Sequence, residues 1–332
     1  MPSTRRHFLR SGAAVLPLPG LLAAPFSQAQ QAALVETLKI VTGFAAGGTS
    51  DAVCRRVAEG LRGVYARTAL VENKTGAGGQ IAIQSMKSAP TDGTVVLQTP
   101  ASMLTIYPHI YKKLQYDPVK DLVPVSLACT FEFGFTVGPL VPATVKTVPE
   151  FLAWAKAHPE NASYGSPAAG STPHFTGEML SRAGGANMRH VAYRGTQPAI
   201  LELVGGQIPA VCGPIGDFLP HLAGGRIRIL GVSGAKRSRF VPNVPTLAEQ
   251  GLKDIVTDEW FAFYLPAGSS AEVAQRLNAA LRTALAKPEV IDGLAAMGLE
   301  TKSSTQAELA ELQRRDTERW GPIVKAVGFT AD

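Results

Sequence analysis

Apolar positions along the chain follow two alternating rhythms, one typical of strands and one typical of helices. Leu38, Ile40 and Val41 lie in a β-leaning run that ends at a glycine-bearing turn. Beyond the turn, apolar residues recur at spacings of four, four and three, at Val53, Val57, Leu61 and Val64. That spacing places them on one face of a helix. The segment therefore predicts a strand, a tight turn and a helix.

The same unit of strand, turn and helix recurs along the chain. Residues 68–72 and 95–99 are predicted strands on either side of a helix at 80–89, and later strands end near Tyr164, Ala192 and Cys212. Strands that alternate with helices favour an α/β fold with parallel, doubly wound sheets. Ligands of such sheets bind beyond the carboxyl ends of the strands, which is where these turns fall.

The order of the elements predicts two lobes. A long β-leaning stretch leads from the first group of units into the second, and the two final helices have no strands left for a third sheet. We expect those helices to pack back on the first lobe. The prediction is lobe 1 from residues 30–136 and 258–332, lobe 2 from residues 137–257, and two hinge crossings near residues 136 and 258.

The first turn is the strongest candidate for chemistry. Gly47 and Gly48 allow positive φ and close backbone approach, and Thr49 or Ser50 can cap the following helix. A cup of backbone N–H groups at the positive end of a helix suits an anion. The structural alternative is an ordinary connection between strand and helix. The later run Gly76–Gly79 is not a P-loop, because no Lys-Ser/Thr pair follows it. It is not a dinucleotide fingerprint either, because its glycines have the wrong spacing.

The N-terminus has the pattern of an export signal. Arg5 and Arg6 precede a modest apolar run, and Ser27-Gln28-Ala29 places small residues where a signal peptidase cuts. The apolar run is too short and too rich in proline to span a membrane. We predict a twin-arginine-like signal over residues 1–29, cleavage after Ala29 and a periplasmic mature protein.

Charge and cysteine content exclude several classes. The chain has 32 lysines and arginines against 26 acidic residues, and removal of the signal takes away three arginines, which leaves 29 against 26, or +3. This excess is too mild for a nucleic-acid-binding protein. Cys54, Cys129 and Cys212 are far apart and odd in number, which argues against a disulfide framework or a thiolate metal site, although one oxidised pair stays open.

Several motifs, in order along nearly the whole mature chain, carry a resemblance to a known family. They are Gly47-Gly48-Thr49-Ser50-Asp51, Glu72 to Gly79, Tyr164-Gly165-Ser166, His190 to Gly195, Leu203 to Gln207 and Val244 to Gly251. Together they resemble the Bug family, the TctC-like periplasmic solute-binding proteins of tripartite tricarboxylate transporters. The resemblance implies a two-lobed periplasmic binding fold of type II, the Venus-flytrap architecture, that closes on a small carboxylate.

The resemblance also implies which loops hold the ligand. From lobe 1 it implicates Phe44, Ala46, Gly47, Gly48, Thr49, Ser50, Asp51, Gly78, Gly79, Pro100, Ala101 and Ser102. From lobe 2 it implicates Ser166, Ala168, Gly170, Ser171, Thr172, His174, Tyr193, Arg194, Gly195, Thr196, Gly213 and Asp217. No catalytic residue, metal ligand or cofactor is expected.

The sequence departs from the family pattern at a few positions. Ala46 and Thr75 replace usual prolines, and Arg194 replaces a common lysine. Pro209 and Gly213 stand where acidic residues are common, which argues against a basic or amino-bearing ligand.

Structural roles compete with binding roles at single residues. Thr49, Ser50, Ser171 and Thr172 are helix caps or ligand contacts. For Asp51 we favour a structural role, since its charge suits a first helical turn but opposes an anion. His174 is favoured as a packed or solvent-exposed histidine over a ligand group, and Arg194 is favoured as a solvated arginine over a counter-ion.

Three classes of function stay open from the sequence. The favoured one is a monomeric binding protein that delivers a small carboxylate to the membrane permease of a tripartite tricarboxylate transporter. A receptor that reports its ligand to a sensor protein needs the same closed surface. An enzyme is disfavoured, because the sequence lacks Gly-x-Ser-x-Gly, His-Glu-x-x-His and any Cys/His cluster. No nucleic-acid partner is expected.

Overall fold

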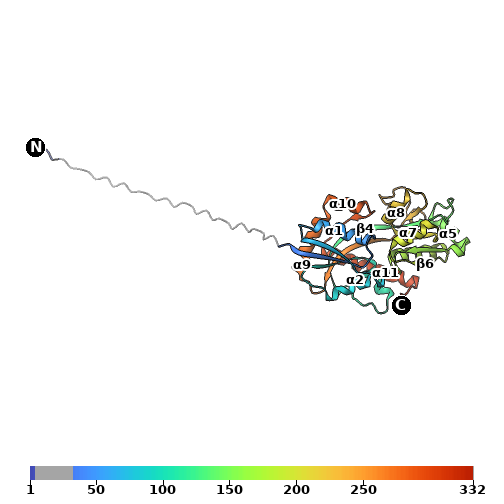
Figure 1. Ribbon diagram of the computed structural model, residues 1–332, viewed down its shortest axis with the longest axis horizontal. Coiled ribbons are helices and arrows are strands. Elements are labelled where there is room, and N and C mark those ends of the chain that lie inside the picture. The colour runs from blue at the N-terminus through green and yellow to red at the C-terminus, as the bar shows by residue number, and fades with distance from the viewer. Residues whose placement is uncertain (4–32, 332) are drawn as a thin grey trace. The chain divides into compact units, whose positions relative to one another are not determined.

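The computed structural model describes residues 1–3 and 33–331, and the account below concerns the part from Leu34 onward. The predicted export signal and its cleavage after Ala29 lie outside the described residues, apart from Met1–Ser3. From Leu34 onward the chain builds two lobes on two sheets that share one long strand, and Figure 1 shows that strand, β4, between them.

Lobe 1 is built on a mixed sheet with the strand order β2-β1-β3-β9-β4. Its strands are β1 (Val35–Thr42), β2 (Ala66–Asn73), β3 (Val95–Pro100), β4 (Leu122–Val137), β9 (Asp258–Pro266) and the short β10 (Glu300–Thr301). Its helices are α1 (Thr49–Leu61), α2 (Gln80–Ser85), α3 (Ser102–Thr105), α4 (Tyr107–Ile110), α9 (Ala271–Leu285), α10 (Pro288–Ala295) and α11 (Gln306–Val327), with 3-10 turns at Ala77–Gly79 and Met86–Ser88.

Lobe 2 continues the order from β4 through β7, β5 and β6, and β8 also pairs with β4. Its own strands are β5 (Ser163–Ser166), β6 (Arg189–Ala192), β7 (Ala210–Pro214) and β8 (Arg228–Val232). Its helices are α5 (Val148–Ala157), α6 (Thr172–Gly184), α7 (Thr196–Gly205) and α8 (Ile215–Leu222), with a 3-10 turn at Pro159–Asn161.

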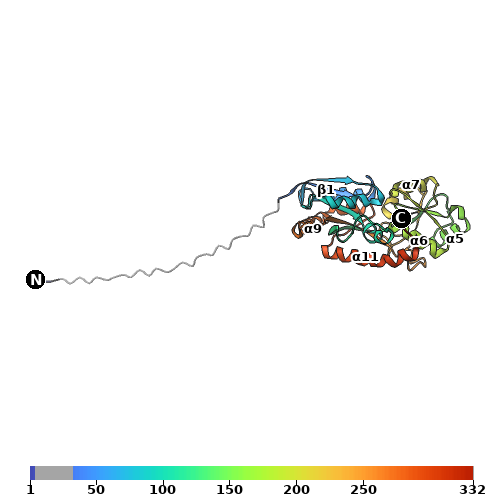
Figure 2. The ribbon, with the colours of Figure 1, turned by 90° about the horizontal axis from the view of Figure 1, so that it is seen from below.

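Strand β4 crosses from one lobe to the other. Its first part, Leu122–Glu132, pairs with β9, and its last part, Phe133–Val137, pairs with β7 and β8. The chain returns to lobe 1 where β9 begins at Asp258. The predicted residue ranges of the two lobes stay a proposal, which this strand pairing supports. Figure 2 shows α11 lying along one side of the molecule from lobe 1 towards α6 of lobe 2.

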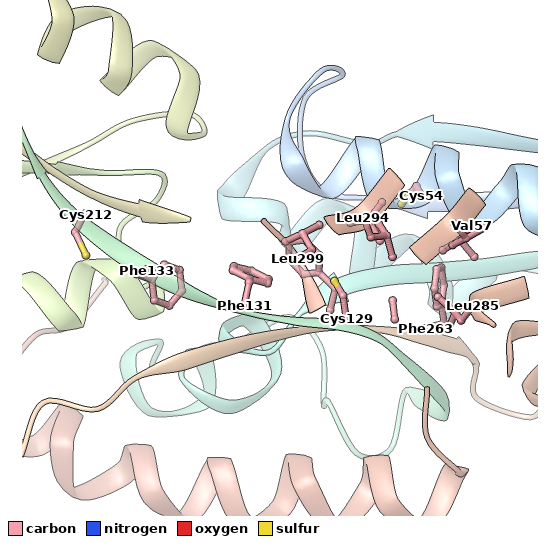
Figure 3. Packing of buried hydrophobic residues seen from close by; sticks show 14 of the residues in the cluster. Cys54, Val57, Cys129, Phe131, Phe133, Cys212, Phe263, Leu285, Leu294 and Leu299 are labelled. Carbon is pink, nitrogen blue, oxygen red and sulfur yellow. The ribbon is translucent and has the colours of Figure 1, made fainter. Parts of the chain in front are cut away.

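The apolar face predicted for the first helix is confirmed. Val53, Val57 and Leu61 of α1 are fully buried, whereas Val64 follows the end of the helix at Leu61. Burial of each such side chain stabilises the fold by about 1.5–3 kcal/mol. The three cysteines are buried free thiols. Figure 3 shows Cys54, Cys129 and Cys212 at separate points of the core, Cys129 and Phe131 in lobe 1 and Cys212 in lobe 2.

The strand directions and the short helices of lobe 1 differ from the sequence-based expectation. The sheets are not purely parallel, because β4 and β9 run antiparallel to their neighbours, as strands that leave a lobe and return to it must. Helices α3, α4 and α10 were not predicted, since their four to eight residues are too few to establish a clear period.

Candidate functional site

A cleft of about 180 Å³ lies between the two lobes. Lobe 1 lines it with the residues that follow β1 and β3, and lobe 2 with the residues that follow β5, β6 and β7. All five loops stand at the carboxyl ends of their strands, where doubly wound sheets bind ligands. The structure therefore brings together loops that lie far apart in the sequence.

Four helices point their amino ends at the cleft. Helix α1 contributes Gly48 to Ser50, α6 contributes Ser171, α7 contributes Gly195 and Thr196, and α8 contributes Pro214 and Asp217. None of these four helices has a side chain capping its first turn. Their N–H groups carry partial positive charge, and together they favour an anion.

The sequence allowed Thr49 or Ser50 to cap α1, but neither does so. The residue at the cap position is Gly48. The hydroxyl of Ser50 lies 2.5 Å from the side-chain oxygen of Gln98, to which it donates a hydrogen bond. The hydroxyl of Thr49 donates to the Asp217 carboxylate across the cleft, at 2.6 Å. Thr49 thus joins the two lobes, and this structure has them in contact.

Asp51 has the structural role favoured by the sequence. Its buried carboxylate accepts hydrogen bonds from the N–H of Gly47, the guanidinium of Arg55 and the amide of Asn73. Burial tends to raise the pKa of Asp51, but these donors outweigh burial and lower the pKa below its ordinary value. Asp51 therefore holds the glycine turn in place from behind and does not line the cleft.

The sequence analysis missed the floor of the cleft, which comes from the two crossing strands. Phe131 and Phe133 of β4 and Glu259 and Phe261 of β9 line it. Successive side chains of a strand point to opposite faces, so residues two apart share the cleft side. Phe131 also lies opposite Glu259 in the pairing of the two strands. Figure 3 shows Phe131 and Phe133 side by side along β4 where it passes between the lobes.

Glu259 is a buried acid at this floor. One carboxylate oxygen accepts a hydrogen bond from the N–H of Ser102 at 3.0 Å, and Thr172 also donates to the carboxylate. Burial is the dominant influence and raises the pKa of Glu259 to about 8, in spite of these two donors. The group is therefore mostly protonated and neutral at pH 7.

The raised pKa of Glu259 predicts how stability depends on pH. Between the ordinary pKa of 4.5 and the folded pKa of about 8, only the folded state keeps the proton. Unfolding then releases a proton, so stability falls as pH rises through this window, by up to about 1.4 kcal/mol per pH unit. Glu259→Gln, which keeps an acceptor for Ser102 and does not titrate, should gain roughly 3 kcal/mol of stability relative to the wild type between pH 5 and pH 8.

Urea unfolding at both pH values checks this expectation. An equal difference between Glu259→Gln and the wild type at pH 5 and pH 8 would mean that Glu259 does not hold its proton in the folded protein.

The predicted site residues fall into three groups. Those that line the cleft are Phe44, Ala46, Gly48, Thr49, Ser50, Pro100, Ser102, Ala168, Ser171, Arg194, Gly195, Thr196 and Asp217. Gly78, Gly79 and Tyr193 line an adjoining hollow, which shares Phe44 and Arg194 with the cleft. The remaining predicted residues line neither the cleft nor the adjoining hollow: Gly47, Asp51, Ala101, Ser166, Gly170, Thr172, His174 and Gly213.

His174 and Ser166 belong to a cluster that supports the loop between β5 and α6. His174 Nδ1 accepts the N–H of Gly170 at 3.0 Å, and its ring stacks on His190 at a centroid distance of 3.8 Å. Burial lowers the pKa of His174 to about 3 and that of His190 to about 4, so both are neutral at pH 7. Ser166 Oγ lies 2.7 Å from His190 Nε2, but Ser166 is fully buried and does not line the cleft. The pair therefore does not face the cleft as a nucleophile and its base would.

Among the described residues, no three or more His, Cys, Asp or Glu side chains gather where they could hold a metal ion. Within residues 1–3 and 33–331, no helix has the length and apolar character needed to cross a membrane.

Comparisons with known proteins agree with the fold. The model of the TctC family, described as the tripartite tricarboxylate transporter family receptor, matches residues 53–329. A Cupriavidus necator protein, named UPF0065 protein in gbd 5'region, is 33% identical over 332 residues, 98% of each chain. Two Rhodopseudomonas palustris structures are similar. MatC with bound malate has 27% identity and a TM-score of 0.80 over 87% of this chain and 99% of that chain. Rpa4515 with adipate has 26% identity and a TM-score of 0.84 over 89% and 98%.

Proposed function

The chain belongs to the TctC family of tripartite tricarboxylate transporter receptors, and on this premise we propose that it captures a small carboxylate in the periplasm by closing its lobes and delivers it to a transporter permease. The family predicted from the sequence motifs is confirmed, and so is the two-lobed periplasmic binding fold. Export, release of the signal near Ala29, a monomeric state and the permease partner are parts of the proposal.

One observation carries the proposal: the uncapped amino ends of four helices, one from lobe 1 and three from lobe 2, converge on a single cleft. An anion placed there is attracted by both lobes at once, so binding favours the closed state over the open one. The bound malate and adipate of two similar R. palustris proteins support a carboxylate as that anion.

Magnitudes explain why closure belongs to the mechanism. Micromolar binding corresponds to about −8.2 kcal/mol, whereas a carboxylate at one exposed helix end gains only about 0.3–1 kcal/mol. Hydrogen bonds to a charged group contribute about 1.5–3 kcal/mol each when water is excluded. Several such bonds become available together only when the loops of both lobes surround the ligand. The candidate donors are the first-turn N–H groups around Thr49, Ser171 and Thr196, with the guanidinium of Arg194 at the rim.

The proposal is tested by thermal and chemical unfolding of the mature protein with a panel of carboxylic acids. An acid present at about 100 times its dissociation constant should stabilise the protein by roughly 2.7 kcal/mol. Neutral amides of the same acids serve as matched controls and should give no shift. If neutral or cationic compounds stabilise the protein and no acid does, the proposed function is wrong.

A further inference from the structure

The floor of the cleft is a cluster of aromatic rings. The rings of Phe131 and Phe261 lie 4.8 Å apart between centroids, and those of Phe131 and Phe133 lie 5.7 Å apart at nearly right angles. Phe44 adds a fourth ring from the first loop of lobe 1. Offset and edge-to-face contacts of this kind are the arrangements that aromatic rings favour, and a further ring can extend them.

The single cation in the cleft fits a ligand with one carboxylate. Of the described residues that line the cleft, Arg194 is the only lysine or arginine. It is exposed at the rim and forms no ion pair with another described residue. Two acids, Asp217 and Glu259, also line the cleft, and both already accept hydrogen bonds from the protein. A second ligand carboxylate would meet no second cation among the described residues of the cleft.

The size of the cleft sets a further limit. An apolar cavity of about 150 Å³ accommodates benzene, and this cleft has about 180 Å³ between aromatic and proline side chains. That is room for one ring with a short acidic substituent.

We propose that the ligand is a monocarboxylate with an aromatic body, whose carboxylate lies at the amino ends of α1 and α7 beside Arg194 and whose ring lies on Phe131 and Phe261. This inference rests on the proposed function and narrows it. The rings stabilise the body by burial and edge-to-face contact, and the described residues of the cleft offer a second ligand carboxylate no further lysine or arginine.

Calorimetric titration of the mature protein with benzoate, malate, adipate and benzylamine tests the inference. We expect benzoate to bind at least 10-fold more tightly than malate or adipate, and benzylamine not to bind. If malate or adipate binds more tightly than benzoate, this inference is overturned and the proposed function stands. If only benzylamine binds, both are overturned. If none of the four compounds binds, this inference is overturned, and the wider panel of acids decides the proposed function.

A substitution on the floor of the cleft separates the effect of the aromatic ring of Phe131 from the effect of its volume. Phe131→Leu keeps an apolar side chain of similar size, so the fold should persist, but the contact between rings is lost. Benzoate affinity should fall roughly 3- to 10-fold, while the affinity for cyclohexanecarboxylate, which has no aromatic face, should change less than 2-fold. Phe263→Leu is the matched control, because Phe263 lies on β9 in the core and does not line the cleft. Equal losses for the two acids would overturn the role of the ring.

Discussion

Replacing Gly216 with alanine is expected to weaken carboxylate binding at least 100-fold while leaving the ligand-free protein nearly as stable as the wild type. Gly216 lies in the first turn of α8 in lobe 2 and contacts the turn after α10 in lobe 1. A Cβ atom at Gly216 would stand 1.6 Å from the carbonyl oxygen of Met297. Neither side of this contact is a flexible side chain, so the lobes must separate to relieve it.

Gly216→Ala should lower the affinity and leave the stability nearly unchanged, because the clash arises only when the two lobes are in contact. Gly216 does not have a positive φ, and alanine is more favourable than glycine in a helix by up to about 1 kcal/mol. The open protein therefore tolerates the change. A ligand that needs both lobes loses at least about 2.7 kcal/mol, the equivalent of 100-fold.

Titration calorimetry of Gly216→Ala with the tightest-binding acid, together with its urea unfolding curve, measures both quantities. Gly224→Ala is the matched control, since a Cβ atom there meets nothing closer than 3.7 Å, and it should bind like the wild type. Wild-type affinity in Gly216→Ala would show that the ligand is held without the contact seen here. A large loss of stability would place the effect in folding.

The loops of the cleft could be predicted from the sequence because one physical rule links them. Each follows a predicted strand and precedes a predicted helix, and the carboxyl ends of parallel strands share one edge of a sheet. The residues around Gly48, Ser171 and Thr196 therefore had to lie near one another within each lobe. The structure adds that both lobes turn these edges toward the same space.

The floor could not be predicted in the same way. The sequence shows alternation in Phe131-Glu132-Phe133 and in Glu259-Trp260-Phe261, but alternation does not say which face is toward the cleft. That choice depends on how β4 and β9 pair and on where the two lobes meet, which are contacts between residues more than one hundred positions apart. Because both faces of a strand are enclosed at a hinge crossing, apolar residues there can line the cleft, as Phe131 and Phe261 do.

In the glycine turn, the residue types could be read from the sequence, but their hydrogen-bond partners could not. Serine and threonine at a helix start favour a cap, yet the hydroxyls of Thr49 and Ser50 bond to Asp217 and Gln98, from distant segments. Asp51 fixes the turn by binding Gly47 directly. With the turn held from behind, the first-turn N–H groups of α1 stay without a side-chain cap and face the cleft.

Removal of the Asp51 carboxylate should therefore affect stability and binding together. In Asp51→Ala, the N–H of Gly47, the amide of Asn73 and the guanidinium of Arg55 all lose an acceptor. Breaking a buried ion pair costs about 3–5 kcal/mol, and because Arg55 is half exposed we expect the lower end, about 3 kcal/mol in urea unfolding. Carboxylate affinity should fall at least 10-fold, since the glycine turn loses its support.

The pH dependence of this loss separates charge from packing. The pKa of Asp51 is lowered in the folded protein, so its contribution is fully present above the ordinary value of 3.8 and disappears as pH falls through the lower folded pKa. The difference between Asp51→Ala and the wild type should accordingly shrink in strong acid, whereas a loss due to packing would persist there. Glu59→Ala is the control on the same helix. Its exposed ion pair with Arg56 should contribute less than about 0.5 kcal/mol, and a comparable loss in that variant would mean that α1 depends on general helix electrostatics and not on the Asp51 contacts.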